Sequence, residues 1–402
     1  MTENVSSQNF NTPPLNFDDT EIAFRSKTDR ELEQAERLFK VINNPMLAKI
    51  GPVLANFALG IGLPVTGIIK NTLFKQFCGG ETVEESEAVI QSLWEANIGT
   101  ILDYSVEGVQ QDSSYSSTAA EITRIIQKAS SDERIPFAVF KLSGIARLGL
   151  LQKISSGEEL TAAEETEYFK VKGRINNICK TASDCDVPVL IDAEESWIQK
   201  AIDNLAVEMM QLYNLERAIV YNTYQLYLTS ALPNLKAHYE QAETYGFILG
   251  AKLVRGAYLE KERERASVWA YTSPVHESKE ATDAAYNDAL KYCVQHIKYI
   301  AFVAGTHNEE SCRLLVKYLR AASVPPNHPH VYFSQLLGMS DNLSFNLANA
   351  GFNVTKYVPY GPVKSVLPYL FRRAEENSAI SGQMGRELSL IVQERKRRGT
   401  LL

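Results

Sequence analysis

Short apolar runs alternate with longer amphipathic or polar stretches through most of the 402-residue chain. A buried strand followed by an amphipathic helix is the repeating unit of parallel α/β folds. Eight successive units favour closure into a barrel, and no run is followed by the GxGxxG turn of a dinucleotide-binding open sheet. The pattern predicts an α/β protein with a (β/α)8 TIM-type barrel, whose strands lie at Thr100–Tyr104, Phe137–Leu142, Val187–Ile191, Ala218–Tyr221, Phe247–Val254, Ile300–Ala304, Val331–Phe333 and Val354–Val358.

The chain before these runs has a different pattern. Residues 1–28 are polar and acidic and lack the basic and apolar regions of a signal peptide, so we expect a flexible N-terminal tail. Apolar spacing predicts a helical arm over residues 29–96, which leaves residues 97–402 for the barrel and its C-terminal helices. The uncharged stretch Ile50–Ile69 approaches the length of a membrane span, but its four glycines and two prolines favour a bent, buried pair of helices.

Composition and charge narrow the range of partners. The 48 acidic residues outnumber the 41 Lys and Arg residues, and a net charge of −7 would repel a phosphate backbone, so we expect no nucleic-acid partner. The basic run Arg395–Arg398 either contacts an anionic membrane surface or forms a solvated helix end. The five cysteines form no CxxC pair and the histidines form no HExxH pattern, so we predict neither a disulfide framework nor a metal site. We expect a cytoplasmic protein, with peripheral contact to the inner face of the membrane as a further hypothesis.

Polar side chains gather at the ends of the predicted strands, where β/α barrels carry their catalytic groups. Lys141 ends an apolar run, and a charge in a sheet must be paired or face a solvated mouth. It therefore either joins an active site or forms a structural ion pair with Asp192 or Glu194. The full set of strand-end candidates is Asp103, Glu107, Lys141, Asp192, Glu194, Glu195, Asn222, Gln225, Lys252, Arg255, Tyr258, Thr306, His307, Asn308, Gln335 and Tyr357.

The segment after the eighth run carries two adjacent arginines. Tyr369, Arg372, Arg373 and Glu376 are spaced i, i+3, i+4 and i+7, which places them on one stripe of a helix. Two guanidinium groups suit a carboxylate, because each offers a planar fork of donors and stays charged. The alternative is a solvated Arg–Glu face, but the position after the last strand favours a binding role.

Several segments together resemble the proline dehydrogenases, from about residue 99 to residue 378. Each motif is modest by itself, but their order on eight predicted strands is specific. The spacing is closer to the monofunctional, FAD-dependent proline oxidases than to the bifunctional bacterial proteins. The segments are Leu102–Glu107, Phe140–Ser143, Leu190–Glu195, Tyr221–Gln225, Lys252–Tyr258, Gly305–Asn308, Gln335–Met339, Tyr357–Gly361 and Arg372–Asn377.

The resemblance implies a reaction and its partners. L-proline would be oxidised to Δ1-pyrroline-5-carboxylate by hydride transfer from proline C5 to N5 of FAD, with a quinone as the electron acceptor. The product would leave for a separate pyrroline-5-carboxylate dehydrogenase. Tyr357 favours proline, because hydroxyproline-preferring members of the family have a smaller residue at this position.

The resemblance also implies roles for individual residues. Arg372 and Arg373 would bind the carboxylate with help from Lys141, Glu107 would gate the pocket by pairing with Arg372, and Asp192 would hold Lys141 and Tyr357. The proline ring would be walled by Tyr258, Tyr357, Tyr369 and Leu337. FAD would contact Asn222, Lys252, Val254, Gly256, Ala257, Thr282, His307, Asn308 and Glu376. Asn222 and Lys252 depart from the Gln and Arg of the bifunctional enzymes.

Three other functions remain open at this point. A flavin enzyme of the same fold could act on 4-hydroxyproline or an N-methylated amino acid, because the fold does not fix the substrate. A lyase or aldolase could use Lys141 or Lys252 to form a Schiff base. A non-catalytic, membrane-associated scaffold is the third alternative.

Overall fold

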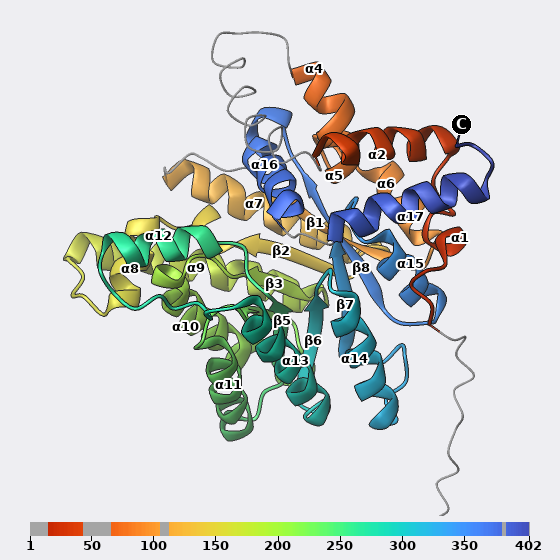
Figure 1. The fold of residues 1–402 in the computed structure, drawn as a ribbon. Coiled ribbons are helices and arrows are strands. Elements are labelled where there is room, and N and C mark those ends of the chain that lie inside the picture. Colours follow the sequence, from red (N-terminus) through yellow and green to blue (C-terminus); the bar gives the residue numbers. More distant parts are fainter. Residues whose placement is uncertain (1–14, 43–65, 105–111, 380–382, 402) are drawn as a thin grey trace, which may run out of the picture.

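The computed structural model describes residues 15–42, 66–104, 112–379 and 383–401, apart from the side chains of residues 66, 68, 374–379, 383 and 384. Eight parallel strands close into a barrel in sequence order, and β8 pairs with β1 (Figure 1). The prediction of a (β/α)8 barrel is confirmed. The strands are β1 Ile98–Tyr104, β2 Phe137–Lys141, β3 Val189–Asp192, β4 Val220–Gln225, β5 Leu249–Val254, β6 Ile300–Gly305, β7 Val331–Leu336 and β8 Val354–Tyr360.

Helices surround the barrel and extend from it at both ends of the chain (Figure 1). Polar caps fix several helix starts: Thr161 and Glu164 form a capping box at α9, and Asn308 caps α14. The helical segments are α1 Thr20–Ala23, α2 Asp29–Ile42, α4 Thr66–Ile69, the π-helical η1 Lys70–Phe74, α5 Lys75–Phe77, α6 Glu87–Trp94, α7 Asp112–Ala129, the 3-10 turn η2 Leu142–Gly144, α8 Leu148–Ser156, α9 Ala162–Asp184, α10 Ser196–Tyr213, α11 Ala231–Tyr245, α12 Leu259–Val268, α13 Lys279–Gln295, α14 Glu309–Ala321, α15 Asp341–Asn349, α16 Val363–Ala379 and α17 Gln383–Arg397.

Several strands extend further at their C-terminal ends than their apolar runs predicted. Strand β4 reaches Gln225, β7 reaches Leu336 and β8 reaches Tyr360. The expectation that Asn222, Gln225 and Gln335 follow their strands is therefore wrong, because all three lie within strands. A run of apolar residues identifies the buried centre of a strand. It does not reveal polar residues that continue the hydrogen bonding between strands at the mouth of a barrel.

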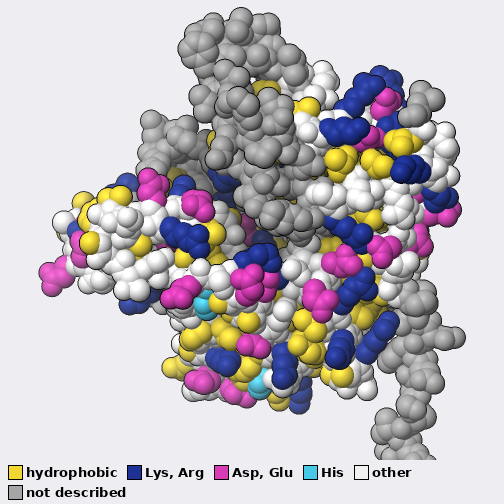
Figure 2. All heavy atoms as spheres, in the orientation of Figure 1, with side chains coloured by type: hydrophobic (Ala, Val, Ile, Leu, Met, Phe, Trp, Pro, Cys, Tyr) yellow, Lys and Arg dark blue, Asp and Glu magenta, His cyan; other side chains and the backbone are white. Residues whose placement is uncertain are grey.

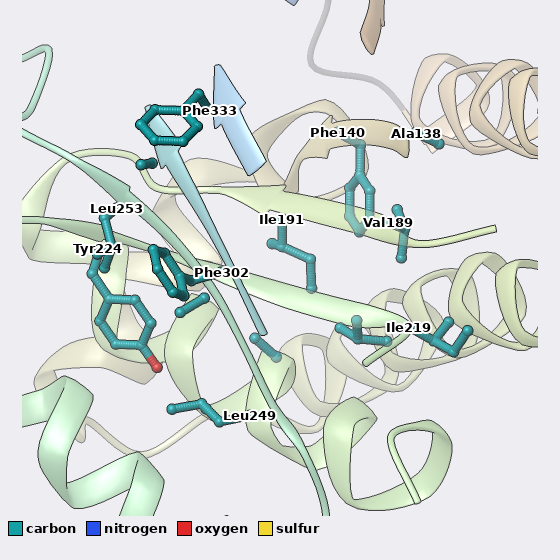
Figure 3. Close-up of a cluster of buried hydrophobic side chains, with 14 of the residues drawn as sticks. Ala138, Phe140, Val189, Ile191, Ile219, Tyr224, Leu249, Leu253, Phe302 and Phe333 are labelled. Carbon is teal, nitrogen blue, oxygen red and sulfur yellow. The ribbon is translucent and has the colours of Figure 1, made fainter. Parts of the chain in front are cut away.

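Side chains on the strands alternate between two hydrophobic clusters. Figure 3 shows outward-facing residues such as Ile191, Tyr224 and Phe302, which pack in the large cluster that includes the surrounding helices. Neighbouring residues such as Leu190 and Tyr221 belong to a separate cluster inside the barrel. Because the period of a strand is two residues, Asp192, Lys252 and Tyr357 point into the barrel and Asn222 points out of it.

A further hydrophobic cluster joins the N-terminal segments to the last two helices. It contains Phe39 of α2 and Phe77 of α5, whose rings meet edge to face with centroids 6.4 Å apart. It also contains residues of α16 and α17, and α17 packs beside α2 in Figure 1. The helix that carries Arg372 and Arg373 therefore rests on the N-terminal arm.

The described part of the N-terminal tail differs from the sequence-based expectation. Residues 15–28 contain α1, and Phe17 and Phe24 are almost completely buried. Asn342 of α15 donates a hydrogen bond to the carbonyl of Phe17 at 3.2 Å, which ties this segment to the barrel. Residues 1–14 and most of the uncharged stretch Ile50–Ile69 lie outside the described residues.

The basic C-terminal run is largely neutralised by ion pairs. Arg395 pairs with Glu36, while Arg397 and Arg398 both pair with Glu394 at 2.8 and 2.7 Å. On the face seen in Figure 2, basic and acidic side chains are interspersed. Of the helices in the described ranges, none is both long enough and apolar enough to cross a membrane.

Candidate functional site

A buried carboxylate connects three strands at the mouth of the barrel. Asp192 is the last residue of β3, and its Oδ1 accepts a hydrogen bond from Lys252 Nζ of β5 at 2.6 Å. Its Oδ2 accepts a hydrogen bond from the Tyr357 hydroxyl of β8 at 2.8 Å. All three residues are at most 9% exposed, so the ion pair offsets the cost of burying a charge.

The three side chains form one interacting unit. Lys252 Nζ lies 4.8 Å from the centroid of the Tyr357 ring, within reach of a cation–π contact. Burial, followed by the charges of Asp103 and Asp192, raises the pKa of Tyr357 well above its ordinary value. The phenol therefore stays protonated and remains a donor to Asp192. The expected contact between Asp192 and Tyr357 is present, and Lys252 joins them.

A second group surrounds Tyr258. Burial raises the pKa of Tyr258 to about 12, against the opposing effect of the charges of Lys141 and Arg372. Glu194 also acts on this phenol, so Lys141, Arg372 and Glu194 each lie within electrostatic range of Tyr258. Lys141 is the Cα partner of Asp192 between β2 and β3, which places this group beside the buried carboxylate.

Glu194 has a strongly perturbed carboxyl group. Its Oε1 accepts a hydrogen bond from the backbone N–H of Ser143 at 2.9 Å. Burial raises the pKa of Glu194 from 4.5 to about 7, although Lys141 opposes the shift. The sequence marked Glu194 as a strand-end candidate, but a displaced pKa depends on tertiary burial and could not be read from the motif.

The last barrel helix contributes a third group. The Arg373 guanidinium lies 5.1 Å from the centroid of the Tyr369 ring, and both residues are less than 9% exposed. Burial, followed by the charges of Lys356 and Arg373, lowers the pKa of His307 to about 3. The His307 ring is therefore neutral. Leu337 donates its N–H to the carbonyl of Tyr357 at 2.9 Å, so it lies at the same side of the mouth.

Gln225, rather than Asn222, is the inward-facing amide of β4. Asn222 donates through Nδ2 to Asp203 of α10 at 2.8 Å, in the layer between barrel and helices. Gln225 donates to the carbonyl of Glu194 at 2.7 Å and accepts from the N–H of Ala257 at 3.2 Å. The expectation that Asn222 faces a ligand at the mouth is corrected accordingly. Gln225 was already a strand-end candidate, and the two-residue period of the strand was the signal that could have assigned the inward-facing position to it rather than to Asn222.

Several residues expected at a cofactor lie on the connections after β5 and β6. Val254 ends β5 and Ala257 follows it, and between them Gly256 has φ +135°. A Cβ on Gly256 would lie 2.2 Å from the Tyr227 ring, so only glycine fits there.

Other residues expected at the cofactor have hydrogen-bond partners within the protein or lie outside the described residues. The Thr282 hydroxyl donates to the carbonyl of Ser278 at 3.2 Å. Asn308 caps α14 by accepting from the N–H of Ser311 at 2.9 Å. Glu107 lies outside the described residues, and the side chain of Glu376 does as well.

Comparison with known proteins identifies the family. Residues 86–386 match the family model described as "Proline dehydrogenase". "Proline dehydrogenase 1, mitochondrial" of Dictyostelium discoideum is 33% identical over 426 residues, which cover 94% of this chain and 74% of that protein. The chain belongs to the proline dehydrogenase family. The family inferred from the sequence motifs is thereby confirmed, together with its class, the oxidoreductases.

Other relatives extend the comparison. The Homo sapiens protein of the same name is 40% identical over 256 residues, which cover 63% of this chain and 42% of that protein. The structure of proline utilization A (PutA) from Bdellovibrio bacteriovorus matches with a TM-score of 0.71 at 18% identity, covering 90% of this chain and 38% of that chain. This structural likeness supports the barrel fold. The matched regions cover less than half of each of these two proteins.

Removing the charge of Asp192 should destabilise the barrel. In Asp192→Asn, Lys252 stays buried without an opposite charge, so we expect the free energy of unfolding to fall by about 3–5 kcal/mol. Urea denaturation measures this change. Asp186→Asn is the matched control, because Asp186 forms an exposed pair with Arg217, and its loss should cost at most about 1 kcal/mol. Equal effects of the two substitutions would contradict the role of Asp192.

Glu194 should make stability depend on pH. Its pKa is about 7 in the folded protein against an ordinary 4.5, so the folded state binds the proton more tightly than the unfolded state. The contribution of this group therefore favours folding at low pH and is lost as pH rises through that interval. Glu194→Gln should reduce the loss of stability between about pH 5 and pH 8, measured by urea denaturation. Part of the loss should persist, because burial also raises the pKa of Glu387 to about 7. An unchanged pH dependence in Glu194→Gln would refute this assignment.

Proposed function

We propose that this protein oxidises L-proline to Δ1-pyrroline-5-carboxylate, with FAD as its cofactor. The observation that carries the proposal is a group of buried or half-buried cations beside tyrosine rings at the mouth of the barrel. Arg373 lies against Tyr369, and Lys141 and Arg372 lie within electrostatic range of Tyr258. This combination suits a cyclic amino acid, because the cations can hold its carboxylate and the tyrosine rings offer flat apolar surfaces for its ring.

In this proposal Arg372, Arg373 and Lys141 bind the carboxylate of proline. The ring lies among Tyr258, Tyr357, Tyr369 and Leu337, and Glu107 gates the site by pairing with Arg372. The hydrogen bond from the Tyr357 hydroxyl to Asp192 holds the Tyr357 ring in place, so its phenol would crowd a 4-hydroxyl group on the substrate. We therefore propose proline rather than 4-hydroxyproline as the substrate.

The residues at the mouth fit a flavin. Lys252 is a buried cation that would stabilise negative charge on a reduced isoalloxazine ring. We propose Gln225 in the place first given to Asn222. With it, the residues proposed to line the cofactor are Lys252, Val254, Gly256, Ala257, Thr282, His307, Asn308 and Glu376.

The side chains of the site prepare the substrate for oxidation. FAD, when bound, supplies the acceptor for the hydride that leaves proline C5. The positive charges of Lys141, Arg372 and Arg373 disfavour the protonated amine of proline and so favour the neutral amine, whose lone pair expels the hydride. The tyrosine walls fix the ring so that C5 is presented in one orientation.

We propose that the electrons pass to a quinone and that the product is released to a separate pyrroline-5-carboxylate dehydrogenase. A quinone resides in the membrane, which would require peripheral contact of a cytoplasmic protein with its inner face. The basic run Arg395–Arg398 gives limited support to that contact, since Arg395, Arg397 and Arg398 are ion-paired within the chain.

The clamp can be tested by removing either arginine. In Arg372→Ala and Arg373→Ala we expect kcat/KM for L-proline to fall by an amount equivalent to about 2–5 kcal/mol, mainly through KM, because a charge-assisted contact is lost. The measurement is steady-state kinetics with an artificial electron acceptor, alongside the flavin content of each variant. Arg320→Ala is the control, because Arg320 is exposed at the end of α14.

The same assay separates the proposed substrate from its alternatives. Activity with L-proline should exceed activity with trans-4-hydroxy-L-proline and with sarcosine in the wild type. Normal proline kinetics in both arginine variants would refute the clamp. A colourless protein that traps its substrate on borohydride treatment would instead indicate a Schiff-base enzyme.

A further inference from the structure

The loop between β7 and α15, residues 337–340, borders the candidate site and also touches the N-terminal arm. Leu337 lies beside Tyr357, because its N–H donates to the Tyr357 carbonyl at 2.9 Å. Gly338 and Ser340 both have left-handed backbones, with φ +75° and +51°. A left-handed conformation is uncommon for serine, so contacts from outside the loop must hold it in shape.

Contacts from β8, from α17 and from the connection after β6 hold the second half of the loop. Lys356 Nζ donates to the carbonyl of Met339 at 2.6 Å. The N–H of Ser340 donates to Glu387 Oε2 at 3.0 Å, and the Ser340 hydroxyl lies 2.9 Å from His307 Nδ1. These contacts act on Met339 and Ser340.

The N-terminal arm holds the first half of the loop. Gln76 of α5 donates through Nε2 to the carbonyl of Gly338 at 2.9 Å, across 262 positions of sequence. The two backbones also approach closely, because a Cβ on Gly338 would lie 2.1 Å from the carbonyl oxygen of Gln76. The adjacent Phe77 is completely buried and shares a hydrophobic cluster with Met339. The arm is therefore packed directly against the residue that follows Leu337.

We propose that Gln76 is a positioning residue that sets substrate specificity by holding Leu337 against the substrate ring. The inference rests on the proposed function, because it takes Leu337 as a wall of the proline site. Without the hydrogen bond from Gln76, the Gly338 carbonyl loses its partner in the arm and Leu337 can retreat from the mouth. A wider mouth makes poorer contact with the ring of proline and admits a ring that carries a 4-hydroxyl group.

The test is Gln76→Met, which keeps the length of the side chain and removes the donor. We expect KM for L-proline to rise about three- to tenfold, the range that corresponds to one neutral hydrogen bond. We expect kcat for L-proline to change less than KM. The ratio of kcat/KM for L-proline to that for trans-4-hydroxy-L-proline should fall, because the wider mouth holds proline less well and admits the 4-hydroxyl group. Gln127→Met is the matched control, since Gln127 is an exposed glutamine on α7, and it should keep wild-type kinetics.

A second variant reaches the same contact from the loop. In Gly338→Ala the new Cβ must displace either the loop or Gln76, so the specificity ratio should fall at least as far as in Gln76→Met. The double variant should resemble Gly338→Ala, because both substitutions break one shared contact and cannot add.

The outcomes separate this inference from the proposed function. If wild-type protein oxidises L-proline but both single variants keep its KM and specificity ratio, the inference is overturned and the proposed function stands. A lower melting temperature or flavin content with unchanged KM and ratio would also overturn it, by showing that the contact is only structural. Failure of the wild-type protein to oxidise L-proline would count against the proposed function itself.

Discussion

The carboxylate of Asp192 is the constraint on which the mouth of the barrel depends. It accepts hydrogen bonds from Lys252 and Tyr357, which belong to strands on different sides of the barrel. A buried charge of this kind is tolerated only when its partners stay in place, so the network fixes the relative positions of three strands. In the proposed site, a ligand in the mouth would lie against the two groups that Asp192 holds, the Tyr357 ring and the Lys252 ammonium group.

The second constraint is the seating of α16. This helix follows β8 and carries Arg372 and Arg373, while its apolar residues pack with the arm and with α17. The arm is therefore part of the support of the candidate site. A barrel alone would leave this helix with its apolar face uncovered, which explains why segments from both ends of the chain meet at one side of the barrel.

The sequence contained most of the fold, because hydrophobic periodicity is a local property. Eight apolar runs located eight strands, and polar residues at the strand ends identified Asp192, Lys252 and Tyr357 in advance. The strand ends themselves were less predictable, since residues such as Gln225 continue the pairing without adding apolar character.

Features that depend on tertiary contacts could not be predicted. The two-residue period of β4 could have shown that Asn222 points out of the barrel, but its partner Asp203 on α10 follows only from the packing of the helix layer. The displaced pKa of Glu194 follows from burial, which no motif encodes. The contact between Gln76 and Gly338 joins residues 262 positions apart, and neither sequence neighbourhood indicates the other.

The most direct measurement is a crystal structure of the protein with FAD and tetrahydrofuran-2-carboxylate, the ring-oxygen analogue of proline that cannot be oxidised at an amine. We expect the carboxylate of the analogue to lie between the guanidinium groups of Arg372 and Arg373, with its ring against Tyr357 and the flavin. The proposed site would be contradicted if both guanidinium groups faced bulk solvent and the analogue or the flavin were bound elsewhere.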